Sequence, residues 1–332
     1  MTFTQLIRVS VVLALLGLQL RVVAADSIAA NPVALKYGLM MQFGLGTFAP
    51  PGEAGSPEHF APTAVDAKNW ARTAKDAGMT FAVLLVKQHS GFCLWETKGY
   101  GYDLSRSPVK IDIIAEYVRA CTAEGIYPGV WYAIRDVRND KGSPTSAIGP
   151  EYFELVKKHI TELHTKYPGI RVQIFGESQK LSKAQFTELA DLVRKLNPSC
   201  EILEFFDGTR NIGRPVGFRP VNKDWIWTPK SESNLESAEE CYKQYTQHVG
   251  SGHAFMLNVG INREGRVPTA FAEVLNRVSG LIKRGTDNAA PNIGGTKKTA
   301  AERLKEIKDL FEKGLITKEA SDQKTKEILD SL

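Results

Sequence analysis

The most constraining feature of the sequence is a regular alternation of short apolar runs with longer segments of helical periodicity between residues 32 and 285. The predicted strands are residues 38–43, 80–86, 129–134, 171–175, 201–206, 224–227 and 254–259. The predicted helices are residues 64–77, 111–124, 151–166, 182–196, 235–249 and 270–284. This order indicates an α/β fold with a parallel sheet covered by helices. Seven strands over about 250 residues favour a closed (β/α)8 TIM-type barrel, and no GxGxxG follows the first strand as a dinucleotide-binding sheet would require.

The first 25 residues have the composition of a signal peptide. Arg8 supplies a positive charge, residues 11–20 are almost entirely apolar, and small residues precede a cleavage point after Ala25. The alternative, a permanent membrane anchor, is disfavoured because Arg21 interrupts an apolar run that is already short for a bilayer. We therefore expect cleavage near Ala25, no membrane span in the mature chain, and a secreted or periplasmic protein.

The C-terminal part of the chain differs from the barrel segment in composition. Residues 286–299 are rich in Gly, Asn, Pro and Lys, which predicts a linker. Residues 300–331 have the periodicity of two short helices separated at Gly314, and residues 304–317 resemble the small module called SHOCT. About 30 residues cannot bury a core of their own. We expect this helical hairpin to pack on the barrel, on a second copy of the chain or on a protein partner.

Charge and cysteine usage exclude some functional classes. The net charge is +5, and no cluster of Lys and Arg is interleaved with aromatic residues, so nucleic-acid binding has little support. No CxxC or Cys/His spacing suggests a zinc site. The composition, with 43% hydrophobic and 24% charged residues, is that of an ordinary globular protein.

Polar and aromatic residues follow the second predicted strand. Residues 87–95 read Lys-Gln-His-Ser-Gly-Phe-Cys-Leu-Trp after the apolar run 81–86. In a (β/α) barrel the carboxyl ends of the strands meet the substrate. The stretch resembles a signature of the α-L-fucosidase family of retaining glycoside hydrolases, Lys-His-His-Asp-Gly-Phe. Gln88 and Ser90 stand where that signature has its first His and its Asp, and His89 is kept.

Three further motifs extend the resemblance over residues 32–285. Residues 36–48 resemble the first-strand signature of the family, although the His of that signature falls at Gln42. Residues 127–132, Tyr-Pro-Gly-Val-Trp-Tyr, resemble the third-strand Lys-Pro-Gly-x-Tyr-Tyr, and residues 257–268 resemble the closing Leu-Asn-Val motif. Nothing in this chain resembles the β-sandwich that usually follows the barrel in this family. The resemblance implies hydrolysis of a terminal α-L-fucosyl bond with retention, without a metal or organic cofactor, so a fucosylated or related glycan is the expected partner.

Both catalytic carboxylates of the family pattern are displaced in this chain. Retaining glycosidases need two carboxyl groups about 5 Å apart. The resemblance puts Gly176 at the position of the nucleophilic Asp, with Glu177 one residue later, and Ser231 at the position of one branch's acid/base Glu, with Glu232 one residue later. A shift of one residue at a strand normally turns a side chain to the opposite face. Asp207 is an alternative nucleophile, because Phe-Phe-Asp-Gly imitates the family motif locally; its other interpretation is a turn residue.

The remaining candidate residues are polar or aromatic and would contact the sugar. They are Gln42, Gln88, His89, Trp95, Tyr132 and Trp227. The two glutamines can donate and accept hydrogen bonds but cannot carry charge. His89 is either a contact to a sugar hydroxyl or a buried core histidine, and the aromatic residues would stack on the pyranose or pack in the core.

Three functions remain open from the sequence. The first is an α-L-fucosidase-like hydrolase whose activity is weak or absent, with Glu177 or Asp207 as nucleophile and Glu232 as acid/base. The second is a non-catalytic barrel that binds fucosylated or related glycans, and the third is a hydrolase for another sugar. Two inward-facing acids about 5 Å apart would favour catalysis, whereas aromatic residues without such a pair would favour binding.

Overall fold

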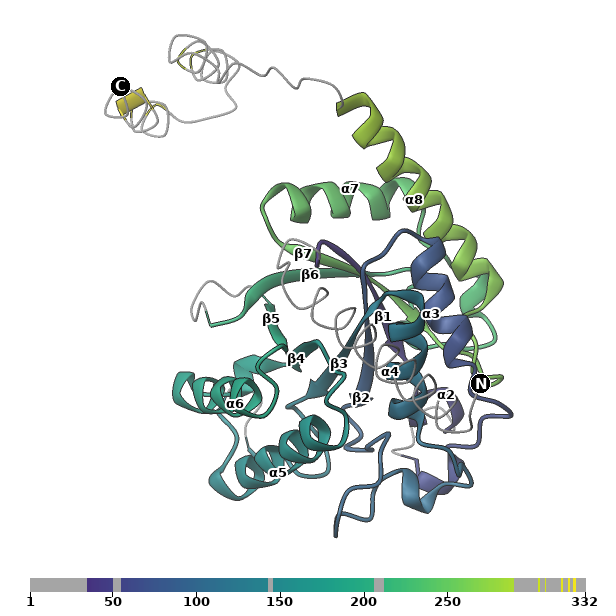
Figure 1. The fold of residues 1–332 in the computed structure, drawn as a ribbon, viewed down its shortest axis with the longest axis vertical. Coiled ribbons are helices and arrows are strands. Elements are labelled where there is room, and N and C mark those ends of the chain that lie inside the picture. Colours follow the sequence, from purple (N-terminus) through teal and green to yellow (C-terminus); the bar gives the residue numbers. More distant parts are fainter. Residues whose placement is uncertain are drawn as a thin grey trace, which may run out of the picture. The chain divides into compact units, whose positions relative to one another are not determined.

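Seven parallel strands close into a barrel in the computed structural model (Figure 1). The structure describes residues 35–49, 55–142, 146–205 and 212–289, together with residues 304, 308, 318, 322, 325 and 326. The strands are β1 (Tyr37–Gln42), β2 (Phe81–Lys87), β3 (Tyr127–Ala133), β4 (Val172–Gly176), β5 (Glu201–Phe205), β6 (Arg214–Pro220) and β7 (Ala254–Gly260). Each strand pairs with the next in parallel, and β1 also pairs with β7, which closes the sheet. The predicted (β/α)8-type barrel is confirmed.

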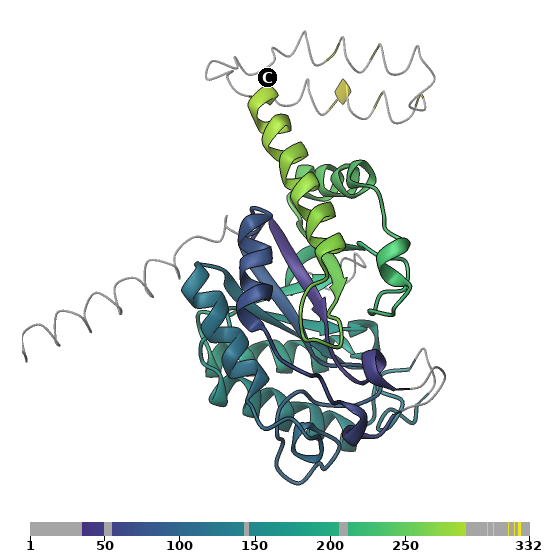
Figure 2. The ribbon, with the colours of Figure 1, turned by 90° about the vertical axis from the view of Figure 1, so that its right-hand side faces the viewer.

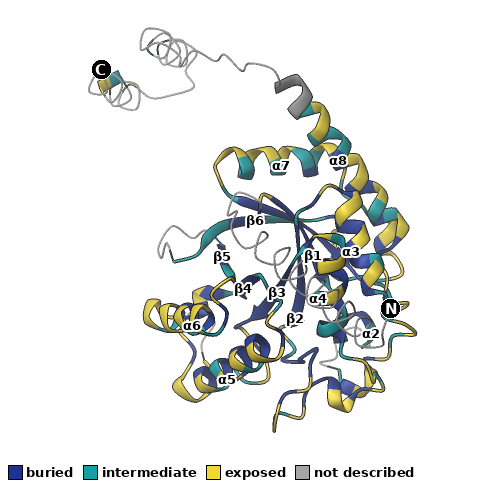
Figure 3. Cartoon of the chain, viewed as in Figure 1, coloured by how far each residue is buried: buried dark blue, intermediate teal, exposed yellow. Residues whose placement is uncertain are grey.

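Helices cover the outside of this sheet. They are α3 (Ala67–Asp76), α4 (Ile113–Glu124), α5 (Pro150–Lys166), α6 (Lys183–Leu196), α7 (Ala238–Gly250) and α8 (Thr269–Ala289), while the four-residue helix α2 (Leu45–Phe48) follows the end of β1. Helices α3 and α4 lie side by side, as do α5 and α6 (Figures 1 and 2). Most strand residues are buried, whereas the helices expose their outer faces (Figure 3). Among the described residues, no helix combines the length and the apolar character that crossing a bilayer demands.

Local sequence signals explain where several helices begin and end. The side chain of Asp112 caps the start of α4 by accepting from the backbone N–H of Ala115. Ser182 and Gln185 form a reciprocal capping box at the start of α6. Gly125 ends α4 with φ of 72°, a left-handed conformation that glycine adopts without steric cost.

Alternate strand residues fill the interior of the barrel. Val83 and Leu85 on β2 and Trp131 and Ala133 on β3 belong to one buried hydrophobic cluster with residues from the other strands. Residues two apart share a face of a strand, so the intervening residues face the helices instead. The inward cluster therefore forms the floor on which any site at the barrel mouth is built.

One predicted strand is wrong. Residues 224–227 were expected to form the sixth strand because they hold two tryptophans and an isoleucine. The sixth strand is instead β6, whose sequence contains two prolines and two arginines and is only partly buried. Proline and charge weaken the strand signal, although Pro215 and Pro220 lie near the two ends of β6, where a missing N–H is tolerated.

Several predicted segments lie at or beyond the limits of the described residues. Helix α8 continues over residues 286–289, the start of the predicted linker. The predicted signal peptide, residues 1–25, lies outside the described residues, as does nearly all of the predicted hairpin, residues 300–331.

A buried histidine couples the fold to pH. The hydroxyl group of Tyr132 lies 2.9 Å from Nδ1 of His159 on α5, and both side chains are buried. Burial, together with the positive charge of Lys87, lowers the pKa of His159 to about 3. Between that pKa and the ordinary histidine value of about 6.5, the unfolded chain binds a proton that the folded chain does not.

We therefore expect the free energy of unfolding to decrease as the pH falls from about 6.5 toward 3. Replacing the imidazole in His159→Gln should reduce the slope of unfolding free energy against pH by up to one proton, about 1.4 kcal/mol per pH unit. Tyr132→Phe is the matched control, because it removes the hydrogen bond at a cost of about 1 kcal/mol but keeps the imidazole and hence the slope. Urea titrations across this pH range measure both, and an unchanged slope in His159→Gln would contradict the assignment.

Candidate active site

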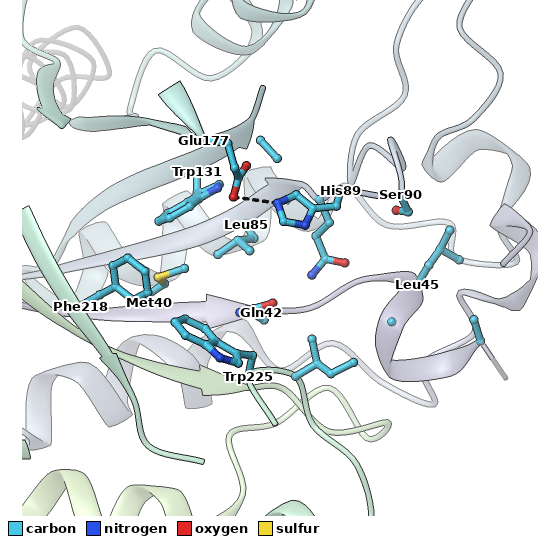
Figure 4. Close-up of a pocket in the computed structure, with 15 residues that line it drawn as sticks. Met40, Gln42, Leu45, Leu85, His89, Ser90, Trp131, Glu177, Phe218 and Trp225 are labelled. Carbon is cyan, nitrogen blue, oxygen red and sulfur yellow. Dashed lines mark ion pairs between the residues drawn. The ribbon is translucent and has the colours of Figure 1, made fainter. Parts of the chain in front are cut away.

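A cavity of about 560 Å³ lies at the carboxyl ends of the barrel strands (Figure 4). Its floor and walls are largely apolar and come from Met40, Leu85, Trp131, Ala133 and Phe218. Its polar groups come from Gln42, Gln88, His89, Ser90 and Glu177, and Leu45, Gly46, Ala49, Trp225 and Ile226 complete the lining. An apolar pocket with a few convergent polar groups is the usual form of a small-molecule site.

The side chains of Glu177 and His89 both line this cavity and contact each other. Nε2 of His89 lies 2.7 Å from Oε1 of Glu177, so the imidazole N–H donates to the carboxylate (Figure 4). The other carboxylate oxygen, Oε2, is buried and, among the described residues, has no hydrogen-bond partner. A buried carboxylate oxygen without a partner is costly unless a ligand or water satisfies it. Because Oε2 has almost no accessible surface, a ligand in the cavity reaches it only if the Glu177 side chain moves.

The backbone of Glu177 explains why its side chain reaches the cavity. Glu177 directly follows β4 and has φ of 51°, in the left-handed region. The rule that a one-residue shift turns a side chain away holds only along an extended strand. Because the left-handed residue breaks the extended backbone, the carboxylate lines the cavity despite its shifted position.

The position before Glu177 is filled by an aromatic ring from the neighbouring strand. A Cβ atom built on Gly176 would lie 1.9 Å from Nε1 of Trp131. Real contacts of this kind do not occur, so residue 176 carries a side chain only if the indole moves. The indole also packs against Phe205 and Phe218, with ring centroids 4.8 and 5.9 Å away.

The two glutamines both line the cavity. Gln42 ends β1 and Gln88 follows β2. The carboxamide of Gln88 lies close to Gly44, where a Cβ atom would be 2.6 Å from Oε1 of Gln88. The glycine therefore leaves space for this side chain beside the cavity.

The three aromatic candidates, Trp95, Tyr132 and Trp227, are not among the residues that line the cavity. Tyr132 faces α5 and is hydrogen-bonded to His159. Trp95 is buried, and its Nε1 donates to Oε2 of Glu162 on the same helix at 3.2 Å. The alternation along β3 explains the first case, since Trp131 faces inward and Tyr132 outward. The sequence prediction that Tyr132 and Trp95 contact the sugar is therefore not supported by their positions.

The displaced acid/base candidate also lies outside the cavity lining. Glu232 is exposed, and one of its oxygens accepts a hydrogen bond from Nε1 of Trp227 at 3.1 Å. Ser231 is buried, and its hydroxyl group accepts from the backbone N–H of Thr228 and donates to Asp224. Ser231 thus closes a turn and does not face the cavity. Asp207 lies outside the described residues, two positions after the end of β5.

Trp225 is a cavity residue that the sequence interpretation missed. Its side chain is 40% exposed, and its ring centroid lies 5.2 Å from that of Phe218. Among the described residues, only Glu177 and Trp225 combine a side chain with a positive φ. Backbone strain of this kind gathers at functional sites. Nothing in the sequence distinguishes Trp225 from Trp227 as a cavity residue, because both fall in the segment 224–227 that is predicted as a strand.

The described lining residues offer hydrogen bonding and aromatic contact. Glu177 is the one carboxylate among the described residues that line the cavity. Within the described residues, no group of three or more His, Cys, Asp or Glu side chains is arranged to hold a metal ion. The arrangement can bind a small polyol with an apolar face, and it presents one acid to it.

Comparisons with known proteins identify the relatives of this chain. The family model described as "Alpha-L-fucosidase" matches residues 32–204. A protein of Oryza sativa subsp. japonica named "Putative alpha-L-fucosidase 1" is 37% identical over 72% of this chain and 55% of its own length. "Alpha-L-fucosidase 1" of Arabidopsis thaliana is 28% identical over 73% of this chain and 56% of its own length. The chain thus spans about half the length of these relatives.

Solved structures share the fold at low sequence identity. An α-L-fucosidase of family GH29 from Bacteroides thetaiotaomicron has a TM-score of 0.64 at 18% sequence identity. The superposition covers 76% of this chain and 72% of that chain. The unliganded α-L-fucosidase AlfC from Lactobacillus casei has a TM-score of 0.63 at 22% identity and covers 80% of this chain and 99% of its own. With the family match over half of the sequence, these findings show that the chain belongs to the α-L-fucosidase family.

Proposed function

We propose that this protein recognises a terminal α-L-fucosyl residue in the cavity and that its hydrolytic turnover is absent or very weak. The observation that carries the proposal is the presence of one carboxylate, Glu177, in the described cavity lining. Retaining hydrolysis uses one carboxylate to attack the anomeric carbon and a second to protonate the leaving oxygen. The family resemblance puts these two groups at Gly176 and Ser231, neither of which can do either task.

The cavity chemistry supports binding of a deoxysugar. Phe218 and Trp225 can contact the C–H faces of a pyranose. Gln42, Gln88 and the carboxylate of Glu177 can bond its hydroxyl groups. A hydrogen bond to a charged group contributes roughly 1.5–3 kcal/mol, so Glu177 should dominate the polar part of the affinity.

Trp131 and Gly176 support a site reshaped for binding. The third-strand motif of the family has Tyr where this chain has Trp131, and the fourth-strand motif has Asp where it has Gly176. The indole occupies the space that a side chain at 176 would need. Trp131 is larger than the Tyr of the family motif and Gly176 is smaller than the Asp, so the space between β3 and β4 stays filled.

A second candidate is slow hydrolysis with retention. It is favoured by the left-handed turn that brings the carboxylate of Glu177 into the cavity lining. In this version Glu177 is the nucleophile. Glu232, the sequence candidate for the acid/base, would have to move to the cavity to protonate the leaving oxygen and then deprotonate the water that releases the sugar.

Binding and turnover measurements separate the two candidates. Isothermal titration with methyl α-L-fucoside should detect binding by the wild type and an affinity at least about tenfold lower in Glu177→Gln, because a charged hydrogen-bond acceptor is lost. Glu232→Gln is the matched control and should bind as the wild type does. On an aryl α-L-fucoside, the wild type, Glu177→Gln, Asp207→Asn and Glu232→Gln should all show negligible rates. Robust wild-type turnover abolished by one of these changes would establish the hydrolase instead.

Restoring the missing carboxylate gives a complementary prediction. Gly176→Asp alone should lower the free energy of unfolding by more than about 2 kcal/mol, because its Cβ overlaps the Trp131 indole. Gly176→Asp with Trp131→Tyr should recover most of that stability. An activated aryl fucoside needs little protonation of its leaving oxygen, so the double variant should hydrolyse it at least about tenfold faster than the wild type. A stable Gly176→Asp single variant would contradict the proposed filling of this space.

A further inference from the structure

The loop that follows β3 lies between the segments that carry His89 and Glu177. The backbone N–H of Val137 donates to the carbonyl oxygen of His89 at 2.9 Å. The N–H of Ile134 donates to the carbonyl oxygen of Gly176, next to Glu177, also at 2.9 Å. Residues 134–142, here called the β3 loop, are therefore bonded to both sides of the site.

Two buried ion pairs reinforce these backbone contacts. Nζ of Lys87 lies 2.9 Å from Oδ2 of Asp136, and both side chains are fully buried. Nζ of Lys180 lies 3.0 Å from Oδ2 of Asp140, with side-chain exposures of 1% and 7%. Both acids belong to the β3 loop. Among the ion pairs of the described residues, these two alone have both side chains less than 10% exposed.

Each lysine is anchored next to one of the two site residues. Lys87 ends β2, two residues before His89, and its Nζ also donates to the carbonyl oxygen of Ala133 at 2.9 Å. The backbone N–H of Lys180 donates to the carbonyl oxygen of Glu177 at 3.0 Å, which closes the turn after β4. One pair thus fixes the His89 side of the site and the other fixes the Glu177 side.

The surroundings of Asp136 leave this carboxylate little freedom. Its oxygens accept hydrogen bonds from the backbone N–H of Arg138 and from Nδ2 of Asn139. A Cβ atom on Gly91 would lie 2.7 Å from Oδ1 of Asp136, so the glycine is needed for the loop to approach it. Burial acts to raise the pKa of Asp136, but the charge of Lys87 and these hydrogen bonds hold it below its ordinary value.

Buried ion pairs contribute little net stability but define geometry. The cost of removing two charges from water nearly offsets their attraction, and replacing such a pair with apolar residues is often neutral for stability. Replacing both partners of such a pair with apolar residues is therefore expected to cost little folding free energy. The expected effect of removing the pair is a change in the relative position of the two segments that it joins.

We propose that the Lys87–Asp136 and Lys180–Asp140 pairs form a clamp that positions His89 against Glu177. The four residues are positioning residues, since they act through the β3 loop and do not line the cavity. The effect of the clamp on sugar affinity rests on the proposed function, whereas its effect on the His89–Glu177 contact does not.

Two apolar double variants test the clamp: Lys87→Met with Asp136→Leu, and Lys180→Met with Asp140→Leu. The matched control, His164→Leu with Gln173→Leu, removes another buried polar contact, of 3.1 Å, behind β4. The chain has six histidines, so the Cε1–H resonance of His89 can be assigned by its absence in His89→Gln. In each clamp variant this resonance should move at least halfway toward its position in Glu177→Gln, and the dissociation constant for methyl α-L-fucoside should rise at least tenfold. The control should change neither.

The outcomes separate the clamp from the proposed function. A wild type that does not bind the fucoside refutes the proposed function, and the His89 resonance still decides the clamp. Folded clamp variants that keep the wild-type resonance overturn the clamp, whatever their sugar affinity. If the more deeply buried Lys87 pair cannot be removed without unfolding, the Lys180 variant decides the same question.

Discussion

The packing of the Trp131 indole beside Gly176 is the contact on which the rest of the site depends. The ring occupies the space that a side chain at residue 176 would need, so no acid can project from the end of β4 at that position. The first residue free to present a carboxylate is Glu177. Its left-handed backbone turns that carboxylate into the cavity, where His89 meets it. The position of the carboxylate in the site therefore depends on the large side chain of Trp131 on β3 and on the absence of a side chain at Gly176 on β4.

Under the proposed function, this site serves recognition and not bond cleavage. Among the described residues, its walls are apolar and aromatic, and its polar groups are two amides, an imidazole, a hydroxyl and one carboxylate. One branch of the family pattern has its second acid at residue 231, which here is a buried serine that closes a turn. The cavity itself lies at the carboxyl ends of the strands. Under the proposed function, this cavity binds the sugar without efficient turnover.

Much of the fold could be predicted because burial imposes a simple pattern. Parallel strands covered on both faces are apolar throughout, and β2 and β7 show this clearly in the sequence. Strand β6 was not predicted because its prolines and arginines interrupt the apolar pattern. The position of Glu177 could not be read from the sequence, since alternation predicts an outward side chain and only a left-handed residue reverses it. Trp131 and Trp225 were missed because a tryptophan in a core and one in a cavity look alike in sequence. The signal peptide, the export and the C-terminal hairpin stay predictions.

The most direct test is a crystal structure of the protein with methyl α-L-fucoside bound. A sugar in the cavity with a hydroxyl group within hydrogen-bond distance of the Glu177 carboxylate, and with no second carboxylate near the glycosidic oxygen, is the result that we predict. A sugar held elsewhere, or a second carboxylate within about 5 Å of Glu177 across the glycosidic bond, would contradict the proposal and indicate a working retaining hydrolase.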